Sequence, residues 1–227
     1  MSIKEFKKSL NEEGIEGEIV KTIFVSLLTS TLTLGVLYFL SLKSIENFIP
    51  KYGFFIFLSA LSFAVLVPAI RQVRAYKEFP CMSGMMIGMT IGMISGFLPA
   101  YYVGSTNGMF WGSALGMAIG IFFGISNGKC CGIMGVMEGI MAGFMGGLMG
   151  AMTAVMVLND NLKYLGIIIF IICATIMFGL NYMIYKESSQ LERKTKENQF
   201  YTIAITFILI TLTTWFIIYG PRSALFQ

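Results

Sequence analysis

Sulfur-bearing side chains dominate the residues of this sequence that could do chemistry. The 227 residues include 17 methionines, four cysteines and no histidine. Fourteen of the methionines lie between Met82 and Met156. Thioether sulfur is a soft, neutral ligand that favours Cu(I) and Ag(I) over Mg²⁺, Ca²⁺ or Na⁺, and it can lie in a bilayer without the desolvation cost of a charge. This composition predicts a soft monovalent cation as the ligand.

The methionines recur at the spacing of a helical turn. Within residues 137–149 they stand four apart, so a helix places them in one column with about 5.4–6 Å between neighbours. A second column begins at Cys81 and continues in steps of four. Such columns would let a soft cation pass from site to site. The candidate metal ligands are Cys81, Met85, Met89, Met93, Cys130, Cys131, Met134, Met137, Glu138, Met141, Met145 and Met149.

Three cysteines add thiols at one predicted face of the membrane. Cys81 begins a predicted span, whereas Cys130 and Cys131 fall in a short connection on the same side. We expect the three to meet as a cytoplasmic entry or exit site, where the charge of Lys129 favours the thiolate form. The alternative is that they are small buried hydrophobic residues, the role that we expect for Cys173 in the middle of a span.

Glu138 is the only carboxylate between Met82 and Met156. An ionisable residue inside a span costs free energy and indicates function, so Glu138 is expected to add charge to the cation site or to carry a proton. If its side chain reaches the cytoplasmic interface instead, it only positions the helix. The methionines also have an alternative explanation, because methionine is a flexible core filler that packs well against glycine.

Composition excludes several classes of function. Without histidine, imidazole metal sites and catalysis by Ser-His-Asp or Cys-His groups cannot occur, and we expect no enzyme activity. The sequence has no phosphate-binding loop of the Gly-x4-Gly-Lys-Ser/Thr type. Its basic residues flank apolar segments, so nucleic acid is not an expected partner. The adjacent Cys130 and Cys131 do not indicate a disulfide framework.

Seven apolar segments predict seven transmembrane helices. Hydrophobic residues make up 56% of the chain and charged residues 12%, and the mean hydropathy is +0.76. In soluble domains, hydrophobic residues make up roughly 45–50% of the chain and charged residues about 25%. A spanning helix needs about 20 mostly apolar residues. The segments that meet this length are 20–42, 52–70, 81–103, 108–127, 131–158, 164–185 and 200–219. The predicted fold class is all-α, a polytopic transmembrane helix bundle.

The spans group into a core with flanking pairs, and lysine and arginine set the orientation. Counted by side, 12 basic residues fall on the side of the N-terminus and four on the other. This asymmetry predicts a cytoplasmic N-terminus in a multi-pass protein of the plasma membrane. The expected parts are a cytoplasmic segment 1–19, two peripheral helices in 20–70, a three-helix core in 81–158, two peripheral helices in 164–219 and a tail 220–227.

Glycine follows its own register through the predicted core. From Gly84 to Gly132 every fourth residue is glycine, with Ala100 as the one exception, and the register resumes at Gly135 after a shift of three. Small residues at this spacing let helix backbones touch, which favours a tightly packed glycine zipper of three helices. The methionines of the fifth span stand two residues from these glycines, about 160–200° around the helix. They should therefore point away from the glycine contact.

Residues 81–156 resemble the core of the Ctr-type copper transporters in the pairing of Met-x3-Met with Gly-x3-Gly. The matching pairs are Met85/Met89, Met89/Met93, Met137/Met141 and Met141/Met145, beside the glycine register. The resemblance implies copper transport through the thioethers. This chain departs from that family in its number of spans and in lacking a methionine-rich extracellular tail, so a trimeric pore is not implied.

The predicted function is transport or channel-like conduction of Cu(I) or Ag(I) along the thioether columns, with a cytoplasmic cysteine site. Expected partners are the lipid bilayer and either a copper chaperone or further copies of the chain. Two alternatives stay open. The chain could be a non-transporting structural or assembly protein with a glycine-zipper core, or a thiol-based metal sensor centred on Cys130 and Cys131.

Overall fold

The residues that the structure describes form a bundle of seven long helices. The computed structural model describes residues 17–40, 52–76, 79–129, 132–188 and 199–222, and no strand occurs in these ranges. Each helix is long and apolar enough to cross a membrane, which confirms the predicted all-α membrane bundle of seven spans. The helices are α2 (Gly17–Leu40), α3 (Phe54–Ala75), α4 (Cys81–Asn107), α5 (Met109–Gly128), α6 (Gly132–Met156), α7 (Leu162–Ser188) and α8 (Gln199–Tyr219).

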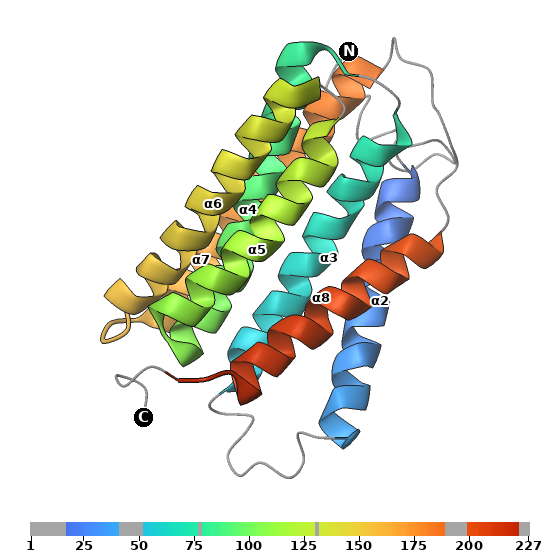
Figure 1. Ribbon diagram of the computed structural model, residues 1–227. Coiled ribbons are helices and arrows are strands. Elements are labelled where there is room, and N and C mark those ends of the chain that lie inside the picture. The colour runs from blue at the N-terminus through green and yellow to red at the C-terminus, as the bar shows by residue number, and fades with distance from the viewer. Residues whose placement is uncertain (1–16, 41–51, 77–78, 130–131, 189–198, 223–227) are drawn as a thin grey trace.

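Successive helices run in opposite directions, so α4 and α6 are parallel and α5 is antiparallel to both (Figure 1). These three helices make the most extensive contacts with one another. On the other side of the bundle, α2 packs on α3 and α8, and α8 crosses α3 obliquely. The bundle therefore consists of one dense group of three helices and a looser set around α3.

The position of α3 differs from the prediction of a peripheral helix. It is buried along most of its length and contacts α2, α4, α7 and α8. Small residues such as Ser59, Ala60 and Ala64 let these neighbours approach. The difference arises because α3 is apolar on all sides, and such a helix suits the lipid and the centre of a bundle equally well.

Glycines bring α4, α5 and α6 into backbone contact. A Cβ atom added at Gly92 of α4 would lie 2.9 Å from the carbonyl oxygen of Gly139 in α6 and 3.2 Å from the Cα of Gly124 in α5. One turn further, a Cβ at Gly96 would lie 2.9 Å from the carbonyl oxygen of Gly143. One glycine from each helix thus meets at the same level. No larger residue fits there without moving a backbone.

A hydrogen bond between side chains joins α3 to α4 inside the bundle. Tyr102 is fully buried, and its hydroxyl lies 2.6 Å from the Oγ of Ser62. Ser62 donates its own proton to the carbonyl oxygen of Leu58 at 2.8 Å. The Tyr102 hydroxyl is therefore the donor toward Ser62.

Removing this bond should lower the free energy of unfolding by about 0.6–1.7 kcal/mol, from the average to the maximum measured for interhelical hydrogen bonds in a membrane protein. We expect Ser62→Ala to show this loss, and Tyr102→Phe to add little to it in a double-mutant cycle on the detergent-solubilised protein. Ser59→Ala is the matched control, because the Ser59 hydroxyl bonds only within its own helix, to Ile56. Fully additive effects of Ser62→Ala and Tyr102→Phe would show that the hydroxyls are not coupled.

Candidate metal-binding surface

The methionines of α6 occupy one exposed face of that helix. Their side chains are between 43% and 70% exposed, whereas the glycines from Gly135 to Gly150 are all buried. The helix therefore presents glycine to α4 and α5 and thioether sulfur to the outside of the bundle, as the spacing predicted. The seven are Met134, Met137, Met141, Met145, Met149, Met152 and Met156.

A second set of exposed methionines on α4 adjoins the first. A Cβ added at Gly146 of α6 would overlap the carbonyl oxygen of Met93, and it would lie 3.0 Å from the Met93 Cα. Because Gly146 directly follows Met145, the two helices bring their methionines to one side of the bundle. The methionine surface is defined by the seven α6 residues together with Met82, Met86, Met89 and Met93. Met85 is partly buried beside it.

Glu138 is the only acidic residue of α4, α5 and α6. It is half-buried and stands four residues after Met134 and three before Met141, so it shares their face of the helix. A carboxylate among thioethers can neutralise a bound monovalent cation. This arrangement permits a site of mixed oxygen and sulfur ligands, but the sulfur atoms greatly outnumber the oxygens.

The predicted cysteine site falls mostly outside the described residues. Cys130 and Cys131 lie outside them, and Cys81 is described only as the first residue of α4. Gly88, two turns after Cys81 in α4, approaches the end of α5, since a Cβ there would lie 3.1 Å from the Cα of Gly128. Within the described parts of the chain, no group of three His, Cys, Asp or Glu residues is placed to hold a metal. Cys173 packs partly buried against the core.

Basic side chains gather at the same end of the bundle. Arg71 of α3 donates to the hydroxyl of Thr22 in α2 at 2.8 Å. The guanidinium carbon of Arg74 lies 4.2 Å from the centre of the Tyr201 ring in α8. Lys129 follows α5 and Lys186 lies in the last turn of α7, both exposed. The cationic end is defined as the end of the bundle at which α3 and α5 finish.

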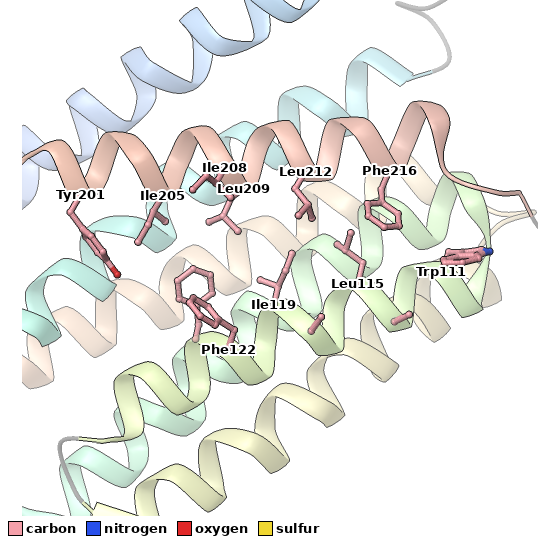
Figure 2. A pocket seen from close by; sticks show the side chains of 13 residues that line it. Trp111, Leu115, Ile119, Phe122, Tyr201, Ile205, Ile208, Leu209, Leu212 and Phe216 are labelled. Carbon is pink, nitrogen blue, oxygen red and sulfur yellow. The ribbon is translucent and has the colours of Figure 1, made fainter.

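The sequence did not predict an apolar groove that separates α5 from α8. Its volume is about 620 Å³, and α5 and α8 supply its walls (Figure 2). Tyr201 stands at the cationic end, and Trp111 stands near Phe216 at the other. The sequence does show aromatic residues near the ends of the two apolar segments. It does not show that α5 and α8 lie side by side, because that depends on the angle at which α8 crosses the bundle.

Comparison with protein-family models, curated proteins and solved structures found no match for this chain. The resemblance to the Ctr-type copper transporter core therefore stays a prediction from Met-x3-Met and Gly-x3-Gly.

Proposed function

We propose that this chain is an integral membrane protein that binds and conducts a soft monovalent cation, Cu(I) or Ag(I), along the methionine surface. The observation that carries the proposal is the separation of side chains on α6, where sulfur occupies the exposed face and glycine the buried one. From Met134 to Met156 the column is about 33 Å long, which matches the roughly 30 Å hydrocarbon core of a bilayer.

Contact with lipid does not by itself require methionine. The exposed face of α7 meets the same surroundings with isoleucine at positions 167, 168, 171, 172 and 176. Methionine on the exposed faces of α4 and α6 is therefore not required by contact with lipid, because α7 makes the same contact with isoleucine. A helical column of soft, neutral ligands supports stepwise movement of a soft cation through hydrocarbon.

The methionines face outward from the single chain, so a second wall is needed to enclose the path of the cation. We assign that wall to the methionine surface of a second copy. In this arrangement the N-terminus is cytoplasmic in the plasma membrane, in keeping with the basic side chains at the cationic end. Cys81, Cys130 and Cys131 would exchange the ion with a copper chaperone there. No covalent step is involved, so the chain is not an enzyme.

Silver flux into proteoliposomes tests this function. We expect vesicles that contain the protein to take up Ag(I) much faster than protein-free vesicles, measured with a silver-selective electrode, and to leave Na⁺ and Mg²⁺ uptake unchanged because thioethers bind hard cations poorly. Silver uptake equal to that of empty vesicles, or equal acceleration of Na⁺, would contradict the proposal.

A non-transporting structural or assembly role is the second candidate. It is favoured by the outward direction of the methionines, which form no passage inside the described part of the single chain. In that case the surface serves only as a flexible contact for lipid or another protein. The two candidates differ in whether thioether sulfur is needed, since leucine fills such a contact about as well.

A further inference from the structure

We propose that the groove between α5 and α8 is a binding site for an acyl chain of an anionic phospholipid, whose headgroup lies against Arg74. The proposal does not depend on cation conduction. It rests on the coincidence of an apolar groove, of a size suited to a hydrocarbon chain, with a fixed positive charge at one of its ends.

The walls of the groove are hydrocarbon along its middle. The small side chains of Ala114 and Ala118 in α5 create the space, and Leu209 and Leu212 line it from α8. Among the lining side chains, polar atoms occur only in the Tyr201 hydroxyl and the Trp111 indole, which stand at opposite ends (Figure 2). A ligand that fills this groove must therefore be apolar over its length and can be polar only at its ends.

The shape of the groove suits a linear apolar ligand. From Tyr201 to Phe216 the α8 wall is about 22 Å long. The volume of the groove is about 620 Å³. An extended acyl chain can lie along this wall with its polar end beside Tyr201, whereas a helix of a second copy would bring no anionic group to that end.

The charge at one end selects the headgroup. Arg74 is exposed and stacks 4.2 Å from the centre of the Tyr201 ring, so its permanent charge stands at the mouth of the groove. A guanidinium binds phosphate well, and an interfacial cation favours an anionic lipid.

Lipid binding to the full-length protein in detergent, followed by native mass spectrometry, tests the proposal. With phosphatidylglycerol and phosphatidylcholine as probes, we expect the wild-type protein to retain the anionic lipid about fivefold better, the effect of one basic residue near a membrane surface. Ala118→Trp should lose both lipids because it fills the groove. Arg74→Gln should keep phosphatidylcholine and lose the preference.

Gly179→Trp is the matched control, because it adds the same side chain on α7 where nothing lies within 4 Å. Equal retention of lipid by Ala118→Trp and Gly179→Trp would overturn the proposal, since the lipid would then bind the surface without selection. A change from dimer to monomer in Ala118→Trp with unchanged lipid would overturn it in favour of a second copy as occupant.

Quenching of tryptophan fluorescence by brominated lipids tests the proposal without a substitution that fills the groove. The chain contains two tryptophans, and Trp215→Phe leaves only Trp111, at the end of the groove. We expect phosphatidylglycerol brominated at the end of its acyl chain to quench Trp111 at lower mole fraction than brominated phosphatidylcholine does. Identical quenching curves for the two lipids would contradict the assignment.

Discussion

Alanine at Gly124 is expected to disrupt the contact between α5 and α6 and to cost at least about 3 kcal/mol of stability. Its Cβ would overlap the carbonyl oxygen of Gly139 and lie 3.0 Å from that residue's Cα. Overpacking in a core typically costs about 1–3 kcal/mol and occasionally more. Here the obstacle is backbone, which can yield only if a whole helix shifts. Gly139→Ala should behave in the same way, since its Cβ would overlap the Gly124 carbonyl.

Two glycines outside the three-helix group are matched controls. Gly35 in α2 and Gly179 in α7 have nothing within 4 Å of an added Cβ. Alanine there should leave stability unchanged or raise it by up to about 1 kcal/mol, because alanine is the better helix former. The measurement is the temperature at which detergent-solubilised protein loses its monodisperse elution peak. If Gly124→Ala and Gly35→Ala lose this peak at the same temperature, the backbone contact described between α5 and α6 is contradicted.

Glycine spacing made the three-helix group predictable from sequence. A residue without Cβ is needed wherever backbones touch, so the recurrence at Gly92, Gly124 and Gly139 has one simple structural cause. The central position of α3 was not predictable in this way. Its residues are apolar on all sides, and apolar contacts with lipid and with protein select the same side chains.

The relative placement of methionine and glycine on α6 was also predictable, because helical periodicity fixes the angle between residues such as Met145 and Gly147. Periodicity does not determine what lies opposite the methionine face of α6. That face could have met another helix of the same chain, whereas it is exposed. The groove beside Ala118 was not predicted, since it depends on the crossing of α8 over α3, which no local pattern encodes.

Replacing Met137, Met141 and Met145 together by leucine is expected to weaken Ag(I) or Cu(I) binding in the middle of the α6 column at least about 100-fold, and so to stop silver uptake by proteoliposomes, while the fold survives. Loss of groups that only support metal ligands already costs about 10–100-fold in affinity, so loss of the ligands costs at least as much. The fold should survive because all three side chains are exposed and leucine has similar volume. The matched control replaces Met109, Met117 and Met183, which lie outside the methionine surface.

The most direct measurement of the central claim is copper K-edge X-ray absorption on the Cu(I)-loaded protein with all four cysteines replaced by serine. Thiolates are then absent, so any sulfur around copper comes from methionine. We predict a first shell of sulfur in this protein and in the control with substituted Met109, Met117 and Met183, and its loss when all eleven methionines of the methionine surface are replaced by leucine. A shell of oxygen or nitrogen alone, or a sulfur shell that persists in the variant without these eleven methionines, would contradict a cation path along the methionine surface.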